Sequence, residues 1–477
     1  MKKQIKPIIY IVFASIILSG CKTLNTNLSI SENKIPASFS SNSTDTINIA
    51  KINWKEYFED KNLIELIDTA LKNNQDLQIA LQNIETYRSH VKLAKAAQVP
   101  VINANTTFWQ RKFGYYTMDD AGNRVTEFAP GDTIPKHLPD FFAGVTTNWE
   151  VDVWGKIKNQ KRAAVANYLA SLEGRNFVVA NLVSDIAIAY FELLALDSEL
   201  EIIQQAIVKQ EEALNIVKFQ KEAGRANELA VQQFQSQLIQ SKIMELEKLQ
   251  QIIVVENNVN FLLGRYPQNI KRNKASLFRE IPASIAAGIP SQLLVLRPDV
   301  REAEFQLQAS KFNLKASKAL FFPTFNISAA FGFQAYSATF LFATPQSIMY
   351  SALGSLTAPI VNRKAIKAQF SNAKANQLAA MYNYQKAILN GYVEVAIELS
   401  NIENLAKIFS LKKEQSEVLI NSVETSTELF KTARANYLEV LLAQQNSLQT
   451  QLELINLSKN QQIATVNIYM ALGGGWR

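Results

Sequence analysis

The sequence predicts a mostly helical chain, built as two similar halves, that also contributes β-strands to a membrane. Three observations lead to this fold class. The phrase RANELAV at 225–231 returns as RANYLEV at 434–440, which indicates an internal repeat. Several segments alternate apolar and polar residues with a period of two, as half-buried strands do. Long stretches without proline, such as 157–222, would form helices of about 100 Å at roughly 1.5 Å per residue.

The first residues form a targeting segment. Three lysines among the first six residues precede an apolar run at 8–18, which is too short to span a bilayer as a permanent helix. The run ends in LSGC at 18–21, which resembles the lipobox of bacterial lipoproteins. The resemblance implies that the signal peptide, 1–20, is removed and that Cys21 becomes the acylated first residue. The alternative is an ordinary signal peptide with an incidental cysteine.

The residues after the signal peptide predict a location and a tether. Lys22, rather than an aspartate, follows the cysteine, and by resemblance to the sorting rule of enteric bacteria this favours the outer membrane. Residues 21–53 form a lipidated polar tether. Cys21 is the only cysteine, so no intrachain disulfide can form. The formal net charge of +7 falls to 46 − 42 = +4 without the three lysines of the signal peptide, so we expect no nucleic-acid partner.

Further matches accompany the repeated phrase in the same order along the chain. At a shift of 223 residues, DLxxA at 76–80 aligns with DVxxA at 299–303, and at a shift of 209 the pair LG at 263–264 aligns with 472–473. We therefore expect repeat 1 at 54–264, a connector or equatorial region at 265–290, repeat 2 at 291–473 and a short tail at 474–477.

Each half has the same order of elements. A helix at 61–97 in repeat 1, or 298–320 in repeat 2, stops before Pro100 or Pro323. After the proline, the apolar residues recur at every second position, as in a β-strand, instead of with a helical period. The expected strands lie at about 101–114 and 140–154 in repeat 1, and at about 324–336 and 346–360 in repeat 2.

The strand at 140–154 shows the alternation clearly. One face carries the apolar residues Phe141, Ala143, Val145, Trp149, Val151 and Val153, and the other carries Gly144, Thr146, Asn148, Glu150 and Asp152. Long strands that are apolar on one face, with aromatic residues at their ends, are typical of a transmembrane barrel. A soluble sandwich is the alternative, since its strands alternate too.

Four strands cannot close a membrane barrel, because the smallest such barrels need roughly 8. An open edge in lipid would leave backbone groups without hydrogen-bond partners. The chain must therefore combine strands from copies of itself. Two copies would give a barrel filled by side chains, and three would leave a lumen.

Long helical hairpins follow each pair of strands and turn at 224–227 and 433–436. Gly224 can take the left-handed conformation that ends a helix, and Asn227 and Asn436 can cap the helices that follow. Ala433 stands where the first copy has Gly224, which leaves the geometry of the second turn open. Leu441, Leu448 and Ile455 recur every seven residues, as in coiled coils. The helices can form either a solvated stalk or the wall of a tube.

The sequence contains no recognisable enzyme site, cofactor motif or metal-ligand set. His90 and His137 are the only histidines and lie in unlike segments. The loop at 117–138 contains Asp119 and Asp120, for which a solvated loop is favoured over cation binding. We therefore expect a protein that is not an enzyme.

At this point the residues match a family. The chain resembles the TolC-like outer membrane factors, and most closely the lipoprotein branch that serves multidrug efflux pumps. The resemblance rests on four stretches: WKEYFEDKNLIELIDTALKNNQDLQIAL (54–81), WEVDVWGK (149–156), GIPSQLLVLRPDVREAE (288–304) and NIYMALGGGW (467–476).

The resemblance implies a homotrimer, with a barrel of about 12 strands, four from each chain, continued by an α-helical coiled-coil tube across the periplasm. It implies a passive exit duct in the outer membrane that works with a periplasmic adaptor protein and an inner-membrane RND-type pump, in contact with outer-membrane lipids. One alternative is the duct of a type I protein secretion system, and another is a lipid-anchored periplasmic coiled-coil scaffold without a pore.

The resemblance also implies site residues. The closed channel is expected to narrow at Leu438 and Leu442, where an apolar ring would exclude water. Relatives often carry an acidic residue at the second of these places. The adaptor is expected to contact the hairpin tips at Gly224, Arg225, Ala226, Asn227, Arg434, Ala435 and Asn436.

Overall fold

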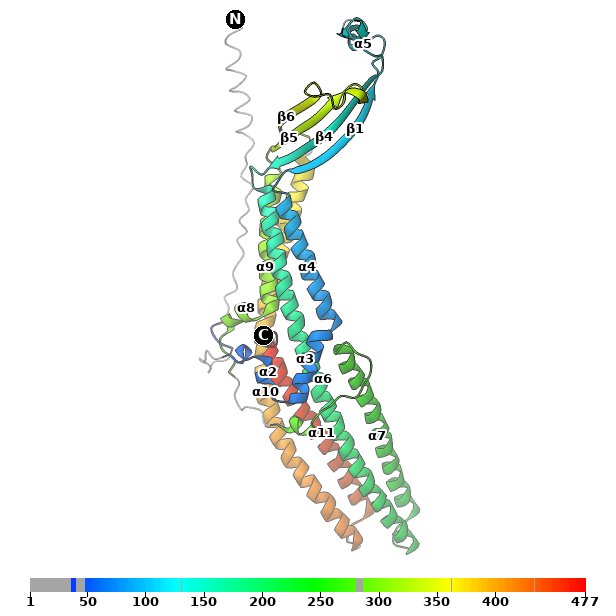
Figure 1. Ribbon diagram of the computed structural model, residues 1–477. Helices are drawn as coiled ribbons and strands as arrows, with labels where there is room; N and C mark the ends of the chain where they lie inside the picture. Colours follow the sequence, from blue (N-terminus) through cyan, green and yellow to red (C-terminus); the bar gives the residue numbers. More distant parts are fainter. Residues whose placement is uncertain (1–35, 40–47, 130, 280–285, 362, 433) are drawn as a thin grey trace. The chain divides into compact units, whose positions relative to one another are not determined.

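The computed structural model describes residues 36–39 and 48–477, apart from 130, 280–285, 362 and 433 (Figure 1). The described chain divides into two compact units. The sheet unit contains Tyr87–Tyr168 and Gln306–Met381, and the hairpin unit contains Ser31–Thr86, Leu169–Phe305 and Tyr382–Arg477. The predicted signal peptide, Cys21 and Ala433 lie outside the described residues.

The sheet unit contains a four-stranded antiparallel sheet in the order β1-β4-β5-β6. Its strands are β1 (Val101–Arg111), β4 (Leu138–Val151), β5 (Thr324–Ala335) and β6 (Ile348–Thr357). The two central strands come from different halves of the sequence. β1 and β6 form the edges, and each has one side of its backbone unpaired within this chain.

The strands differ by a few residues from the predicted spans 101–114, 140–154, 324–336 and 346–360. β4 is an example, because Asp152 was expected on its polar face. Instead the Asp152 carboxylate accepts hydrogen bonds from the backbone N–H groups of Ile157 (3.0 Å) and Lys158 (2.7 Å). Asp152 thereby satisfies donors at the start of the helix that follows, and β4 ends before it.

The register of the sheet separates its two faces. The apolar face contains the predicted Phe141, Ala143, Val145, Trp149 and Val151, with Phe331 and Ile327 of β5 opposite Val145 and Trp149. The opposite face is richer in polar and small side chains, although Trp109, Phe142 and Leu353 also lie on it. It includes Asn103, Asn105, Thr107, Gly144, Thr146, Asn148, Asn326, Ser328, Gly332, Ser351, Ser355 and Thr357.

Gly144 and Gly332 allow the two central strands to approach closely. They lie opposite each other in the register, and a Cβ atom added to Gly144 would lie 2.4 Å from the carbonyl oxygen of Phe331. Any side chain at this pair would push the strands apart.

Seven longer helices make up most of the described chain. They are α3 (Lys61–Asn73), α4 (Gln75–Ala96), α6 (Lys156–Glu222), α7 (Glu228–Leu262), α9 (Pro298–Ala319), α10 (Arg363–Lys431) and α11 (Tyr437–Ala471). The shorter elements are η1 (Ile49–Lys51), α2 (Trp54–Tyr57), α5 (Met118–Asn123), β2 (Glu127–Ala129), β3 (Asp132–Thr133), η2 (Lys274–Phe278), η3 (Pro290–Gln292), α8 (Leu293–Leu296) and η4 (Ala338–Phe340).

The first predicted helix, 61–97, is interrupted at Asn74. Asn74 has an extended backbone (φ −62°, ψ 129°) and ends α3. Its side chain accepts a hydrogen bond from the N–H of Leu77 (3.0 Å) and donates one to the carbonyl oxygen of Leu262 (2.9 Å). Asn74 therefore starts α4 and fastens this bend to the end of α7.

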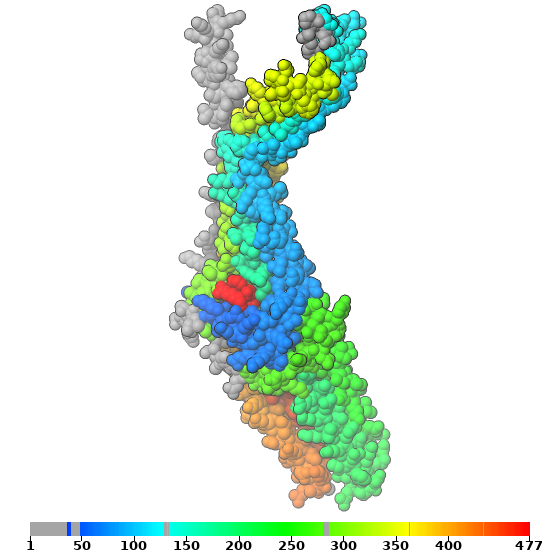
Figure 2. Space-filling view, viewed as in Figure 1, coloured from blue at the N-terminus to red at the C-terminus, as the bar shows by residue number. Residues whose placement is uncertain are grey.

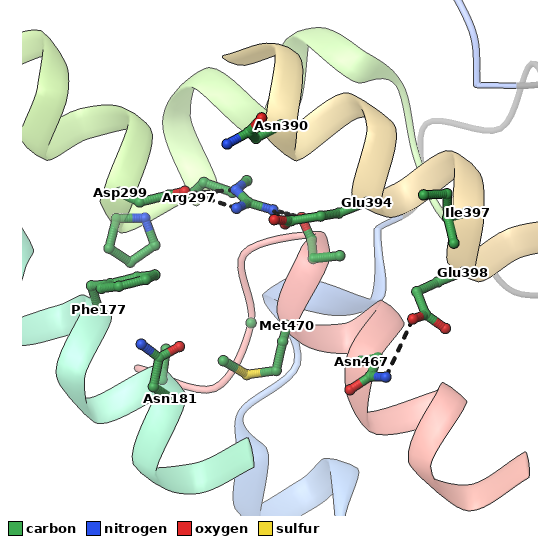
Figure 3. A pocket seen from close by; sticks show the side chains of 14 residues that line it. Phe177, Asn181, Arg297, Asp299, Asn390, Glu394, Ile397, Glu398, Asn467 and Met470 are labelled. Carbon is green, nitrogen blue, oxygen red and sulfur yellow. Dashed lines mark hydrogen bonds and ion pairs between the residues drawn. The ribbon is translucent and has the colours of Figure 1, made fainter. Parts of the chain in front are cut away.

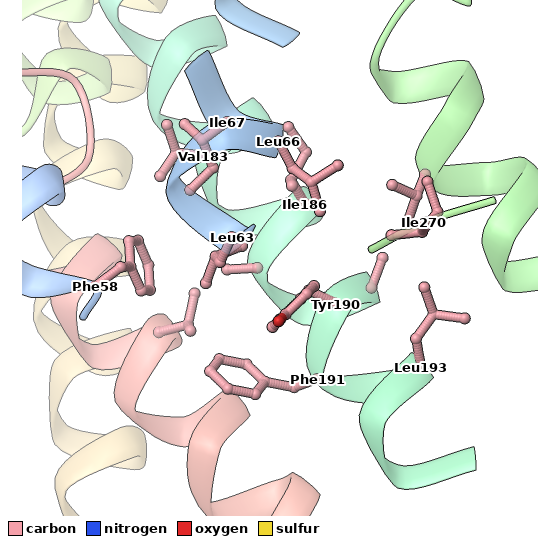
Figure 4. Close-up of a cluster of buried hydrophobic side chains, with 14 of the residues drawn as sticks. Phe58, Leu63, Leu66, Ile67, Val183, Ile186, Tyr190, Phe191, Leu193 and Ile270 are labelled. Atoms are coloured by element: carbon pink, nitrogen blue, oxygen red, sulfur yellow. The ribbon is translucent and has the colours of Figure 1, made fainter. Parts of the chain in front are cut away.

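The hairpin unit has its main hydrophobic core around the middle of α6 (Figure 4). Leu63, Ile67 and Ile186 are fully buried there, and each contributes about 1.5–3 kcal/mol of transfer free energy. Tyr190 is also fully buried in this core, and its hydroxyl donates a hydrogen bond to Asp60 Oδ2 (2.8 Å). Burial raises the pKa of Tyr190 above its ordinary value. α6 is also the one helix of the described residues that is apolar enough to cross a membrane, but 61% of its most apolar window is buried inside the protein.

The C-terminal residues pack beside the start of the described chain (Figure 2). The hydroxyl of Tyr469 donates to the carbonyl oxygen of Ile52 (2.7 Å), and its ring stacks on Tyr57 at 4.0 Å between centroids. The indole N–H of Trp476 donates to the carbonyl oxygen of Leu296 (3.1 Å). The ALGGGW motif thus holds the end of repeat 2 against earlier segments of the hairpin unit.

Candidate functional site

The first hairpin turn joins α6 to α7. Gly224 has φ +72°, and the N–H of Arg225 donates to the carbonyl oxygen of Gln220 (2.8 Å), which closes the end of α6. Asn227 Oδ1 accepts a hydrogen bond from the N–H of Ala230 (3.0 Å) and caps α7. The side chains of Arg225 and Asn227 are exposed.

The second turn, between α10 and α11, repeats this hydrogen-bond pattern. The N–H of Arg434 donates to the carbonyl oxygen of Leu429 (2.8 Å), the counterpart of the bond made by Arg225. Asn436 Oδ1 accepts from the N–H groups of Leu438 (2.8 Å) and Glu439 (3.2 Å). The Glu439 carboxylate in turn accepts from the N–H of Asn436 (3.1 Å), which completes a capping box that the first turn lacks.

A hydrophobic cluster lies directly behind both turns. Val217, Phe234, Phe430 and Val440 are buried in it, and Ala226 and Ala435 of the two turns pack against it. These contacts hold the backbone of both turns against the ends of the helices. The predicted tip residues therefore divide into two packed alanines and the exposed side chains of Arg225, Asn227, Arg434 and Asn436.

Leu438 and Leu442 lie on the opposite side of α11 from the buried cluster. Their side chains are 44% and 48% exposed, whereas Val440 and Ala443 are 1% and 7% exposed. A pair of exposed leucines one turn apart presents an apolar surface outside the core of this chain. The repeat counterpart of Leu438 is Leu229, which is 53% exposed on α7.

A polar cavity of about 260 Å³ lies between α6, α10 and α11, close to the turns. Gln210, Gln444 and Ser447 line it, and Gln210 and Ser447 are buried. The Oε1 atoms of Gln210 and Gln444 accept no hydrogen bond from a described residue. Polar contacts of this kind hold helices together less firmly than apolar ones, because separation lets water satisfy the amides.

Arg297 and Asp299, part of the RPD sequence at 297–299, belong to an ion cluster at the start of α9 (Figure 3). The side chain of Arg297 is only 8% exposed and pairs with Asp299 (2.8 Å) and Glu394 (2.6 Å). Its Nη1 also donates to the carbonyl oxygen of Ala471 (2.9 Å). Burial lowers the pKa of Arg297, but the two carboxylates outweigh this effect and raise the pKa above its ordinary value.

The Arg297 cluster borders a cavity of about 570 Å³. Phe177, Asn181, Glu398, Asn467 and Met470 are among its lining residues, and Asn467 donates a hydrogen bond to Glu398 (3.2 Å). The described residues contain no group of three or more His, Cys, Asp or Glu side chains placed to hold a metal ion. The cluster therefore acts as a clamp that joins α9, α10 and the end of α11.

An amphipathic sheet with two unpaired edges, combined with helical hairpins of this length, defines a channel-forming envelope protein that is completed by further copies. A family model described as outer membrane efflux protein matches residues 66–265 and 289–474, so the chain belongs to this family. The predicted family, fold class and outer-membrane location are therefore confirmed, as is the role as an outer-membrane efflux component.

Individual relatives cover almost the whole chain. It is 28% identical to the probable outer membrane lipoprotein SilC of Salmonella typhimurium over 96% of this chain and 97% of SilC. It is 29% identical to the solvent efflux pump outer membrane protein SrpC of Pseudomonas putida, over 88% of this chain and 87% of SrpC. A solved structure of CusC superposes with a TM-score of 0.80 at 25% identity, covering 94% of this chain and 99% of that chain.

Proposed function

We propose that the chain is the passive exit duct of a tripartite efflux system and acts as a homotrimer. The observation that carries this proposal is the four-stranded sheet, whose edges β1 and β6 are both unpaired and whose faces are sharply divided. In lipid, an unpaired edge costs several kcal/mol for each backbone group, so β6 of one copy is expected to pair with β1 of the next. Three copies give about 12 strands and an open lumen lined by the polar face.

Apolar stripes on the helices support lateral assembly. Ile239, Leu246 and Ile253 lie seven residues apart on α7 and are all exposed in the single chain. Leu411 and Val418 have the same spacing on α10 and are also exposed. Such stripes bury their apolar area when neighbouring copies pack side by side, which favours a tube wall over a solvated stalk.

The hairpin turns supply the proposed gate and the proposed adaptor contacts. Three copies of Leu438 and Leu442 would form an apolar constriction that closes the duct by excluding water. Arg225, Asn227, Arg434 and Asn436 would face the periplasmic adaptor. The polar cavity at Gln210 and Gln444 lets the α10–α11 hairpin separate from α6 at low cost when the duct opens.

The proposed cargo is small organic molecules delivered by an inner-membrane RND-type pump, which supplies the energy. Relatives are named for both cation and solvent efflux. The closing ALGGGW (471–476) resembles the terminal motif of the drug-efflux branch, which supports organic cargo. The amphipathic sheet favours a pore over a scaffold, because a scaffold has no use for a lipid-facing sheet.

Lipid anchoring completes the proposal. Cys21 lies outside the described residues, and we propose that its acylation fixes the N-terminus in the outer membrane. Replacement of Cys21 by Ser should leave the trimer able to form pores after purification but remove palmitate labelling of the chain. Retained labelling would contradict the assignment of Cys21.

The cargo is tested in a strain that lacks the gene for this chain. The strain should accumulate fluorescent organic efflux substrates and recover on complementation with the wild-type gene. Sensitivity to metal cations alone, with unchanged accumulation of organic compounds, would assign the duct to cation efflux. Loss of a secreted protein, with both sensitivities unchanged, would favour the type I secretion duct.

A further inference from the structure

Charge on the polar face of the sheet is confined to its two ends. Among the described strand residues of that face, only Arg111, Asp140 and Glu150 are charged. Between these two ends, the described strand residues of this face have neutral side chains. Glu150 is neutralised by Lys156, whose Nζ lies 2.6 Å from a Glu150 carboxylate oxygen. Arg111 and Asp140 are the charged residues of this face that form no ion pair with a described residue.

Arg111 and Asp140 lie together at the loop end of the sheet. Arg111 is paired with Leu138, and Asp140 is paired with Trp109, which makes the two charged residues diagonal neighbours on one face. Such neighbours lie roughly 7–8 Å apart. The guanidinium carbon of Arg111 lies 4.1 Å from the ring centroid of Phe113 and 5.7 Å from that of Trp109. Aromatic rings thus hold Arg111 without cancelling its charge.

Asp140 is held by a neutral partner. Gln334 Nε2 lies 3.0 Å from Asp140 Oδ1 and 2.8 Å from Oδ2, so the carboxylate is oriented by an amide rather than by a cation. A cavity of about 560 Å³ opens at this place, and its lining includes Trp109, Arg111, Asp140 and Gln334. The two opposite charges are therefore accessible to small solutes and remain separate from each other.

We propose that Arg111 and Asp140 form the charge filter at the outer mouth of the duct, where Asp140 attracts small cations and Arg111 attracts small anions. The inference rests on the proposed function, because trimer symmetry repeats the pair three times around the lumen. Long loops of outer-membrane barrels face the exterior, which places the loop end of the sheet outside. The proposed constriction at Leu438 and Leu442 is uncharged, so it cannot sort solutes by the sign of their charge.

The test is ion selectivity of the purified full-length trimer in planar bilayers under a KCl gradient. Asp140→Asn should lower the ratio of potassium to chloride permeability by about twofold, and Arg111→Gln should raise it by about the same factor. The conservative variants Asp140→Glu and Arg111→Lys keep the charges and should keep the wild-type ratio. The double variant Glu150→Gln, Lys156→Gln removes an ion pair of zero net charge, between Glu150 of this face and the first residue of α6, and serves as the matched control.

The two single variants must shift the permeability ratio in opposite directions, which a general loss of structure would not do. Channels with an unchanged ratio in both variants, or with a shift in the same direction, would overturn the charge filter and leave the duct intact. A trimer that opens no channels even when Leu438→Ala and Leu442→Ala remove the proposed gate would overturn the proposed duct and the filter together. Gel mobility of the heat-stable trimer shows that each variant has assembled.

Discussion

Leu438 and Leu442 lie one helical turn apart on α11, and both remain about half exposed while Val440 between them is buried. The same helix therefore packs one face into the hairpin core and presents two leucines on the other. This division is what an apolar gate requires, because the buried face holds the helix and the exposed face can meet the copies related by symmetry.

Replacing the leucines of the proposed gate by smaller side chains should widen the closed channel. Leu438→Ala and Leu442→Ala should each raise the single-channel conductance of the trimer, since removal of apolar side chains widens the constriction and admits water. Leu229→Ala is the matched control, because Leu229 corresponds to Leu438 in the other half of the chain and is also about half exposed. Conductance that rises as much in the control as in the gate variants would contradict the assignment.

Charge reversal at the turns should weaken binding of the adaptor. Arg225 and Arg434 contribute their backbone N–H groups to the turns, and their side chains are exposed. Arg225→Glu and Arg434→Glu should therefore leave the turns folded. Substitutions at Asn227 or Asn436 are less informative, because the loss of a helix cap costs about 0.5–2 kcal/mol. Pull-down of the adaptor should fall for both arginine variants and stay normal for Lys271→Glu, an exposed lysine of the connector. Normal pull-down with both arginines reversed would exclude the turns from the interface.

Filling the polar cavity should lock the hairpins together. Gln210→Leu combined with Gln444→Leu removes two amide oxygens that accept no hydrogen bond from a described residue. The loss of each buried oxygen removes a desolvation penalty of about 1–3 kcal/mol. We expect a higher melting temperature and a lower open probability than in the wild type. Gln232→Leu, at an exposed position of α7, should change neither quantity. A more stable variant with an unchanged open probability would show that separation at this cavity is not part of opening.

Loss of the Arg297 clamp should destabilise the hairpin unit. Arg297→Met leaves Asp299 and Glu394 without their cation, and Glu394 is half exposed, so the expected cost is about 2–4 kcal/mol, below the usual range for a fully buried pair. Lys242→Met breaks the half-exposed pair of Lys242 with Glu211 and should cost less than about 1 kcal/mol. Thermal unfolding followed by the helical circular dichroism signal compares the two. Equal melting temperatures would show that the clamp contributes little.

Local patterns in the sequence were sufficient to predict the long helices, the alternating strands and the caps of both turns. RANELAV and RANYLEV share the residues that make the turn, so the bonds from Arg225 and Arg434 recur despite the change from Gly224 to Ala433. The sequence patterns did not predict the break at Asn74, because the side chain of Asn74 bonds to the carbonyl oxygen of Leu262, far along the chain. The helical period of the sequence continues past Asn74, so it predicts one uninterrupted helix at 61–97.

The groups of charged residues could not be predicted from sequence patterns for the same reason. Arg297 belongs to a recognisable motif, but its partner Glu394 lies 97 residues away on another helix. Asp140 and Arg111 sit at opposite ends of a long loop and become neighbours only through the register of β1 and β4. Sequence periodicity assigns a residue to a face, but it cannot align two strands joined by such a loop.

The most direct test of the account is the channel activity of the purified full-length chain, with trimer and heat-dissociated monomer compared in planar bilayers. The account predicts discrete conductance steps from the trimer and none from the monomer, because one copy supplies only part of the barrel. Intact trimers that never conduct even with Leu438→Ala and Leu442→Ala, or monomers that conduct as trimers do, would contradict it.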